Sequence, residues 1–433
     1  MNTRAAIPAL HPRLRPDLRP HLRPLSSRRE QAVLLAAFFL LFPGFFFYHT
    51  LLGTGTTGAF LGGYFAPISV LFALPLTLIY IKRMRRDPRR FHLVDLHLGL
   101  FLLYFAAVIV VNAAAGANRT IVGNHILGCL FIFNMFVIAS FLDFAGRPFR
   151  IVGLLSLAGM SAVAFSYSVD GVFYLGAMGI AKDADALATY QGFARSYLIT
   201  FLPVVAFTRS LPLRLLLHAG GAATLFVNTA RSEFAALMFV IPIIEFYYSR
   251  HKLHFILCGL ILFFVIHLYF DRILAALPDN RILELLDLSH STSANKRHYL
   301  TVHAVQTILA HPLLGDYASY KPGYYSHNVL SAWVDLGFFG IAYLSLVTIV
   351  PIIPMFIREY FAPRHCGIFL LGFSMACVTV LLLITSHYFT DMLIGATLGA
   401  SSRYFYERKY AKNRTPDLRP PAPRHPHLHQ AMS

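Results

Sequence analysis

The sequence is a succession of long apolar runs separated by short polar segments. Twelve of these runs approach about 20 residues, the length at which an α-helix crosses the hydrocarbon core of a bilayer. The pattern therefore predicts an all-α polytopic membrane protein with about 12 transmembrane helices. The predicted spans begin near Gln31, Gly58, Leu93, Ile126, Ile151, Ser196, Leu213, Phe234, Phe255, Val329, Cys366 and Met392.

The distribution of Lys and Arg predicts the orientation. If the N-terminus is cytoplasmic and the spans alternate, 28 of the 37 Lys and Arg residues lie inside and 9 lie outside. Cytoplasmic segments of membrane proteins carry such an excess. We therefore predict a membrane domain over residues 31–407 between two cytoplasmic tails, 1–30 and 408–433. Both tails are rich in Pro, Arg and His, which predicts disorder and contact with anionic lipid head groups.

The composition excludes several classes of protein. Hydrophobic residues make up 57% and charged residues only 13%, whereas a soluble domain carries about 25% charged residues. A soluble enzyme and a disordered chain are both excluded. The net charge is +17, but the basic residues lie in the tails and short loops, so we predict contact with membrane lipids and no nucleic-acid partner. The four cysteines lie within or at the ends of apolar runs and predict no disulfide framework.

Two segments on the predicted outer side are long, residues 169–195 and 272–328. Connections of this length are usually functional or folded. Within the larger one, Asn295 to Leu309 has the pattern of an amphipathic helix that ends at His311-Pro312. Any chemistry is therefore expected on the outer face.

The stretch Ser326-His327-Asn328 lies where the larger outer loop re-enters the membrane, directly after Tyr325. A neutral imidazole can accept a proton near neutral pH, which makes His327 a candidate general base. Asn328 could orient that histidine or a substrate hydroxyl. The alternative is a His–Asn cap at the start of a helix.

Three arginines on the outer side form a second candidate group. Arg231 lies between two apolar runs, Arg195 opens a predicted span, and Arg297 follows Lys296 in the loop helix. An ionisable side chain at membrane depth is costly and suggests a function. One guanidinium group can bind two phosphate oxygens at once. Three arginines around one cavity could therefore hold a diphosphate. The alternative for each is an interfacial anchor.

The acidic residues allow two interpretations each. Glu233 is either a catalytic carboxylate or, as we favour, a partner of Arg231. Asp391 either positions a site residue or stabilises a helix N-terminus. The pair in Asp183-Ala184-Asp185 resembles a metal-binding pattern but is more typical of a solvated turn. The sequence contains no phosphate-binding glycine loop, no cysteine and histidine spacing for zinc and no nucleophile elbow.

Four segments, taken in order, resemble the O-antigen ligase and O-antigen polymerase superfamily of bacterial inner-membrane glycosyltransferases. They are Arg195 at the start of a span, Thr229-Ala230-Arg231-Ser232, Arg297 with His311-Pro312-Leu313-Leu314-Gly315, and Ser326-His327-Asn328 with Asp335-x-Gly337-x-x-Gly340. Two departures are that Gly315-Asp316-Tyr317 lacks a second glycine and that the step from His327 to Gly337 is about one residue short.

The resemblance implies glycosyl transfer at the periplasmic face, from a glycan on undecaprenyl diphosphate, without metal or other cofactor. It makes His327 the general base and Arg195, Arg231 and Arg297 the diphosphate ligands, with Arg231 also catalytic. Tyr325, Asn328 and Asp391 are secondary candidates.

The possible enzymes of this superfamily differ in the molecule that accepts the glycan. We favour an O-antigen ligase of lipopolysaccharide biosynthesis, which transfers the glycan to lipid A–core. A polymerase extends a second lipid-linked glycan instead, and a protein-glycosylating relative uses a protein. A transporter of polyprenyl-linked sugars is the alternative from a different class, and a structural scaffold is a third.

Overall fold

The computed structural model describes residues 27–180, 184–276, 280, 282–285, 292–362 and 365–413 of the 433-residue chain. These residues form a helical bundle whose only strand-like feature is an isolated bridge between Val169 and Val172. Asp183 of the acidic tripeptide lies outside the described residues, whereas Asp185 lies in the short helix η4 (Ala184–Ala186) and is exposed.

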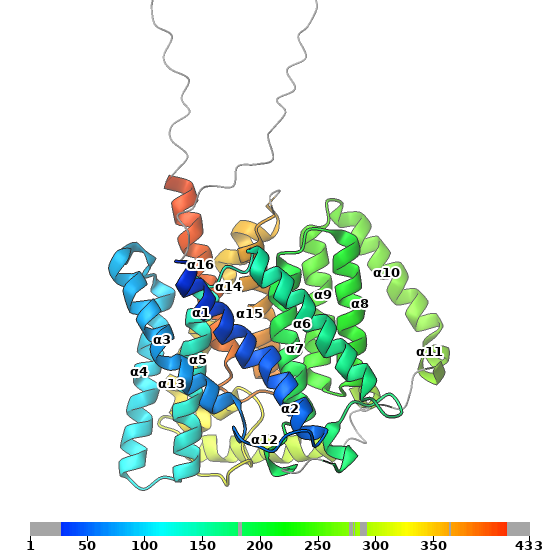
Figure 1. The fold of residues 1–433 in the computed structure, drawn as a ribbon. Helices are drawn as coiled ribbons and strands as arrows, with labels where there is room; N and C mark the ends of the chain where they lie inside the picture. The colour runs from blue at the N-terminus through cyan, green and yellow to red at the C-terminus, as the bar shows by residue number, and fades with distance from the viewer. Residues whose placement is uncertain are drawn as a thin grey trace, which may run out of the picture.

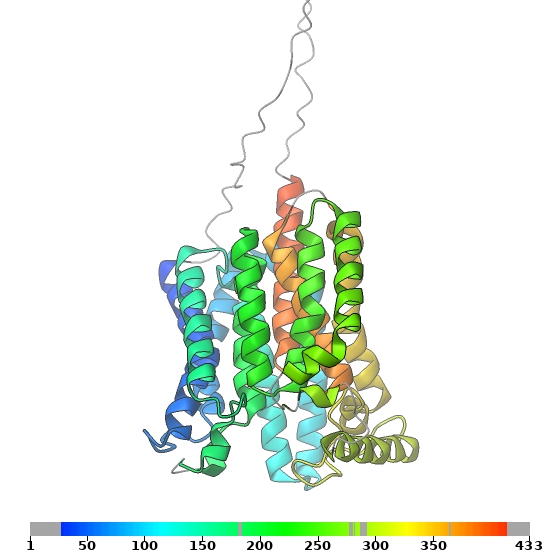
Figure 2. The same ribbon diagram turned by 90° about the vertical axis from the view of Figure 1, so that its right-hand side faces the viewer.

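The long helices run roughly parallel or antiparallel to one another, as Figures 1 and 2 show. Their bounds are α1 (Arg28–Phe39), α2 (Phe45–Gly53), α3 (Phe65–Arg86), α4 (Leu93–Ala114), α5 (Arg119–Phe141), α6 (Arg147–Ser166), α7 (Tyr190–Ala206), α8 (Leu211–Val227), α9 (Arg231–Tyr248), α10 (Lys252–Leu268), α13 (Leu330–Ile349), α15 (Gly367–Thr385) and α16 (Leu393–Asn413).

Shorter elements complete the bundle. The π-helix η1 (Leu40–Gly44) joins α1 to α2, and α14 (Ile352–Met355) with η6 (Phe356–Tyr360) extends α13. The others are η2 (Pro88–Arg90), η3 (Leu175–Met178), α11 (Phe270–Ala276), η5 (Leu283–Leu285) and α12 (Thr292–Ala310).

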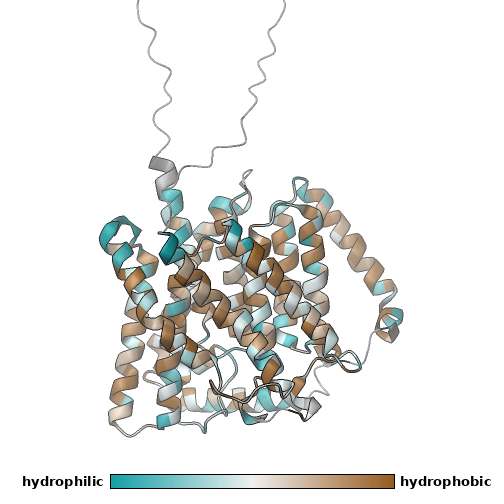
Figure 3. Cartoon of the chain, viewed as in Figure 1, coloured by the Kyte–Doolittle hydropathy of each residue, from teal (hydrophilic) through white to brown (hydrophobic). Residues whose placement is uncertain are grey.

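Each predicted span corresponds to a helix, but the helices differ in length and hydropathy. Seven helical segments among the described residues are long and apolar enough to cross a membrane, and α8 and α10 are shorter apolar helices. The protein is therefore a multi-pass helical membrane protein. The count of 12 crossings stays a prediction. Figure 3 agrees with this class, because apolar residues follow the lengths of the helices and polar residues gather toward their ends.

Helix α10 shows most directly that lipid surrounds the bundle. None of its residues is buried, and Leu253, Phe263 and Phe264 expose 76%, 71% and 64% of their surface. Figure 1 shows α10 on the outside of the bundle. A helix that exposes apolar side chains along most of its length is stable only in an apolar solvent.

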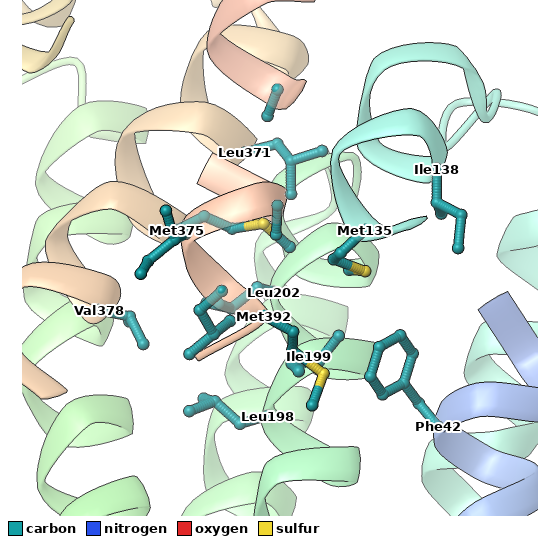
Figure 4. Close-up of a cluster of buried hydrophobic side chains, with 14 of the residues drawn as sticks. Phe42, Met135, Ile138, Leu198, Ile199, Leu202, Leu371, Met375, Val378 and Met392 are labelled. Atoms are coloured by element: carbon teal, nitrogen blue, oxygen red, sulfur yellow. The ribbon is translucent and has the colours of Figure 1, made fainter. Parts of the chain in front are cut away.

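The core lies between α5, α7, α15 and α16. Figure 4 shows part of it, including Met135 of α5, Leu198 of α7 and Met375 of α15, which belong to one buried cluster. Helix α16 approaches α5 closely because Gly395 and Gly399 have no side chain. A Cβ at Gly399 would lie 2.3 Å from the carbonyl oxygen of Phe136. Small residues four apart allow this contact between membrane helices.

Two helices extend beyond the predicted membrane domain of residues 31–407. Helix α1 begins at Arg28, because the Ser27 hydroxyl accepts a hydrogen bond from the Glu30 backbone N–H and the Glu30 carboxylate accepts one from the Ser27 N–H. This capping box fixes the start of the helix. Helix α16 continues to Asn413, past the predicted boundary at 407.

The amphipathic helix predicted over Asn295 to Leu309 is confirmed as α12, which begins three residues earlier. Ala304 and Ile308 on one face pack against Val334 of α13, whereas Tyr299 and Leu309 are exposed. Helix α12 lies across one end of the bundle, at the opposite end from the C-terminal part of α16 (Figures 1 and 2). The first turns of α7 occupy the end of the predicted loop 169–195.

Candidate functional site

A cavity of about 460 Å³ opens at the α12 end of the bundle. Its wall has three parts of different chemistry, which are an apolar aromatic part, a charged part and a part rich in tyrosine and histidine. The first part includes Phe42, Phe45, Phe65 and Phe131, the second includes Arg195, His387 and Asp391, and the third includes His125, Tyr320, Tyr325, His327 and Tyr388.

The aromatic part of the wall comes from η1, α2, α3 and α5. Pro43 lies within the π-helix η1, where it cannot donate a backbone hydrogen bond. Phe42 and Phe45 line the cavity together with Phe65, whose ring packs edge-on against Phe131 at a centroid distance of 4.8 Å. This part of the wall offers only apolar contacts.

The charged part of the wall is a chain of ion pairs. Arg195, in the second turn of α7, places Nη1 3.3 Å from Asp391 Oδ2 and Nη2 3.3 Å from His387 Nε2. His387 in turn contacts Glu233 Oε1 with Nε2, at 3.2 Å. Glu233 is fully buried and also accepts a hydrogen bond from the Ser232 hydroxyl. Four ionisable side chains from α7, α9 and the α15–α16 connection therefore meet, and all but the fully buried Glu233 line the cavity.

Asp391 performs both of the roles that the sequence leaves open. Its Oδ1 accepts a hydrogen bond from the Leu393 backbone N–H at 2.8 Å, which caps α16, and its Oδ2 pairs with Arg195. Burial alone would raise the pKa of this carboxyl, but the charges of Arg195 and His387 outweigh burial and lower the pKa well below its usual range. Asp391 is therefore ionised and fixed in place.

Helix α9 directs Glu233 and Arg231 to different sides. Thr229, just before the helix, adopts a φ of 63°, which is uncommon for a β-branched residue and turns the chain sharply. Successive helical residues are rotated by about 100°, so side chains two apart face nearly opposite directions. Glu233 contacts His387 at the cavity, whereas Arg231 is half-buried and does not line the cavity.

His327 lies on the cavity wall between α12 and α13. Its ring contacts that of Tyr325 at 4.7 Å, and Tyr325 contacts Tyr388 at 4.4 Å. Burial lowers the pKa of His327 to about 4, and the charges of Arg297 and Lys296 act in the same direction. The imidazole is therefore neutral at pH 7 and able to accept a proton.

Gly315 and Gly337 let the loop that leads to these residues pack closely against α13. Gly337 interrupts α13 with a φ of 68° and a ψ of −173°, and a Cβ there would lie 2.2 Å from the Leu313 carbonyl oxygen. The Phe338 N–H donates to Leu313 O and the Asp316 N–H donates to Val334 O. The loop backbone thus satisfies groups that the break in the helix exposes.

A buried network of side-chain hydrogen bonds continues the wall. Asp335 is completely buried and accepts hydrogen bonds from the hydroxyls of Tyr320 and Tyr388. Tyr388 Oη also lies 2.7 Å from His125 Nε2, and His125 Nδ1 lies 2.8 Å from Tyr317 Oη. Aromatic rings with fixed hydroxyl and imidazole groups are suited to contact a sugar ring on its faces and at its hydroxyls.

The structure brings together four of the seven predicted site residues, Arg195, Tyr325, His327 and Asp391. Arg297 is half-buried on α12 and acts on His327 through its charge. Asn328 lies in the turn before α13, where its Oδ1 accepts hydrogen bonds from the Leu330 N–H and the Ser326 hydroxyl. The N-cap residue of α13 is Val329, and Asn328 does not line the cavity, so its predicted role stays a prediction.

The sequence prediction missed His387 and Tyr388. A histidine four residues before an acidic residue, between two apolar runs, was the available signal. Glu233 was predicted as a partner of Arg231, whereas the structure shows it in contact with His387 and Ser232. Within the described part of the chain, no group of three His, Cys, Asp or Glu side chains is arranged to hold a metal ion, and the absence of a metal stays a prediction.

No protein-family model matches this chain, and no curated protein is similar to it in sequence. The structure establishes the class of protein, a multi-pass helical bundle with an amphipathic cavity at one end. Any assignment of function therefore rests on the chemistry of that cavity.

Proposed function

We propose that this protein transfers a glycan from undecaprenyl diphosphate to an acceptor hydroxyl, in O-antigen ligation to lipid A–core. The observation that carries the proposal is the three-part wall of the cavity. A lipid-linked glycan has an apolar chain, a diphosphate and a sugar in that order. The cavity offers an aromatic surface, an arginine fixed by acidic partners and a group of tyrosines beside a neutral histidine.

The reaction needs a leaving group, a nucleophile and a base that accepts one proton. The bond between the anomeric carbon and the diphosphate oxygen breaks, and the bond between the same carbon and the acceptor oxygen forms. The acceptor hydroxyl gives its proton to His327, which is neutral at pH 7. One displacement of this kind inverts the anomeric centre. No nucleotide, metal or other cofactor takes part in this scheme.

Arg195 is the proposed direct ligand of the diphosphate. Its guanidinium lies on the cavity wall, its Nη1 is anchored by Asp391, and its buried Nε has no hydrogen-bond partner among the described residues. Positive charge held at this point stabilises the negative charge that develops on the leaving group. Arg297 and Arg231, which lie off the wall, are proposed to complete the diphosphate site when the donor is bound.

We also propose the orientation of the protein in the bacterial inner membrane. The cavity lies at the end of the bundle where the sequence has few basic residues, and the positive-inside rule assigns that end to the periplasm. Both termini are then cytoplasmic, and twelve helices cross the membrane. The donor lipid reaches the cavity from within the bilayer.

A direct transfer assay tests the proposal and separates its alternatives. Purified protein in detergent receives the glycan on undecaprenyl diphosphate, together with either lipid A–core or a second lipid-linked repeat unit, without metal or ATP. Lipid A–core that carries the glycan is the expected product. A ladder on the lipid carrier would replace the ligase with a polymerase. Failure to transfer to either acceptor would favour the transporter.

A further inference from the structure

His387 lies on the cavity wall in contact with three charged side chains. Only 4% of its side chain is exposed. Arg195 comes from α7 and Glu233 from α9, while Asp391 follows four residues later in the same connection. His327, in the loop before α13, is close enough for the charge of His387 to lower its pKa. This histidine is the point at which these elements meet.

The contacts of the His387 ring indicate its protonation state. Nε2 lies 3.2 Å from Glu233 Oε1, and Nδ1 lies 2.8 Å from Asp391 Oδ2, the latter as a close ionic contact rather than an aligned hydrogen bond. A neutral imidazole carries one N–H, so one nitrogen lone pair would face a carboxylate oxygen. The imidazolium carries two and places positive charge against both carboxylates, and Arg195 Nη2, 3.3 Å from Nε2, then lies beside the ring without donating a hydrogen bond to it.

The charges of the cluster then balance. With His387 protonated, the two cations and the two carboxylates Glu233 and Asp391 sum to zero. With His387 neutral, the cluster keeps two carboxylates and the single cation Arg195, and its net charge is −1. A buried net negative charge beside the cavity repels an anion strongly, because little water screens it.

We propose that His387 is a second cation of the phosphate site, whose proton allows the cavity to accept a diphosphate or another phosphate group. The identity of the ligand as a lipid-linked diphosphate rests on the proposed function, whereas the charge balance of the cluster does not. His387 also acts as a positioning residue, since it shares Asp391 Oδ2 with Arg195 and so fixes the guanidinium at the wall.

The electrostatic surroundings support the charged form. Burial lowers the pKa of His387, and Arg195 acts in the same direction, but Asp391 and Glu233 outweigh both and raise the pKa above its ordinary value. His327 is neutral at pH 7 and adds no opposing charge. Phosphate binding should therefore be strong below the raised pKa of His387 and should weaken as the pH rises through it.

The test is the affinity of the purified full-length protein for three probes between pH 6 and pH 9. A short-chain polyprenyl diphosphate, inorganic pyrophosphate and a polyprenol without phosphate separate the contributions of the lipid and the anion. We expect the Kd of wild type for the diphosphate lipid to rise toward tenfold per pH unit above the pKa of His387, as for any single coupled proton. The polyprenol should show no such dependence, and pyrophosphate should follow the same trend as the diphosphate lipid.

Three variants complete the test. His387→Gln should bind the diphosphate weakly and without the wild-type pH dependence, apart from the titration of the ligand itself. His387→Lys, which stays charged, should bind at pH 9. The matched control is His97→Gln, because His97 contacts Tyr343 at 2.9 Å and does not line the cavity. This control should bind as wild type does.

The outcomes separate this inference from the proposed function. Wild-type affinity that is constant from pH 6 to pH 9, or His387→Gln that binds like wild type at every pH, would overturn the role of His387. Glycan transfer by the same preparations is measured independently. Phosphate binding that depends on His387 without any glycan transfer would keep this inference and remove the proposed function.

Discussion

Two buried arginine clusters in this protein contain the same residue types and are built for different purposes. Arg214 of α8 forms a two-pronged ion pair with Glu245, at 2.7 and 2.9 Å, and its remaining Nη donates to backbone carbonyls. Its side chain is 5% exposed. Arg195 contacts Asp391 through one nitrogen, is 29% exposed and keeps a buried Nε without a hydrogen-bond partner among the described residues.

The two clusters differ in how many N–H groups of each guanidinium are hydrogen-bonded within the protein. His218 also bonds to Glu245, at 2.9 Å, and the Tyr248 ring covers the Arg214 guanidinium at 4.0 Å. Four of the five N–H groups of Arg214 are hydrogen-bonded within the protein, so the cluster holds α8 against α9. A fixed but incompletely paired guanidinium on a cavity wall is instead ready to bind an anion. Burial and charge alone therefore do not distinguish a structural arginine from a functional one.

The largest expected effect is on stability, at the closed cluster. Arg214→Ala leaves Glu245 buried with only His218 as its partner, which should lower the free energy of unfolding by about 3–5 kcal/mol. Thermal unfolding in detergent measures this. The double variant Arg214→Met with Glu245→Met should be less destabilised, because no buried charge is left unpaired. Normal stability of Arg214→Ala would contradict the structural role of this cluster.

The next effect is on activity, at the open cluster. Arg195→Ala should reduce the rate of glycan transfer about 10²- to 10³-fold, as for the loss of one group that stabilises developing charge. Its melting temperature should change little, since His387 remains beside Asp391. Arg195→Lys keeps the positive charge but loses the planar guanidinium. Its transfer rate should lie between those of wild type and Arg195→Ala. If Arg195→Ala were strongly destabilised but transferred glycan at the wild-type rate, Arg195 would be the structural arginine and the comparison with Arg214 would be wrong.

The third prediction concerns the acid side of the pH profile. His327 must be neutral to accept a proton, and its pKa is lowered to about 4. Transfer measured as kcat/KM should therefore be constant from neutral pH down to about pH 5 and should fall as the pH drops through 4. His327→Gln should lose this limb together with about 10²-fold or more of the rate. An unchanged acid limb in that variant would exclude His327 as the base.

The smallest effect is expected from the charge on α12. Burial is the main cause of the low pKa of His327, and Arg297 adds to it through its charge. Arg297→Gln should therefore move the acid limb of kcat/KM to higher pH by a fraction of a unit. Lys296→Gln, at an exposed neighbouring position, should move it in the same direction. A shift to lower pH would show that this electrostatic account is wrong.

Much of the fold could be predicted from the sequence, because membrane helices leave a long local signal. Every predicted span coincides with a helix, and α12 was predicted from its amphipathic pattern within three residues of its observed start. The break at Gly337 could not be predicted. It depends on a backbone pairing with Leu313 and Asp316, which the helical pattern of the flanking residues conceals.

The sequence predicts a residue of the candidate site only where a polar side chain stands out next to an apolar run. Arg195, His327 and Asp391 are polar residues at the ends of apolar runs. His387 depends on Glu233, which is 154 positions away, and no local pattern links them. The three-arginine site was predicted from shared charge and side, but helix geometry turns Arg231 away from the face that carries Glu233.

The most direct test of the account is the release of undecaprenyl diphosphate from a lipid-linked glycan by purified protein, with lipid A–core present and without metal or ATP. The account predicts that wild type releases one lipid diphosphate for each glycan transferred, and that Arg195→Ala releases almost none while it remains folded. Equal release by Arg195→Ala, or transport of the intact donor across a vesicle membrane without release, would contradict it.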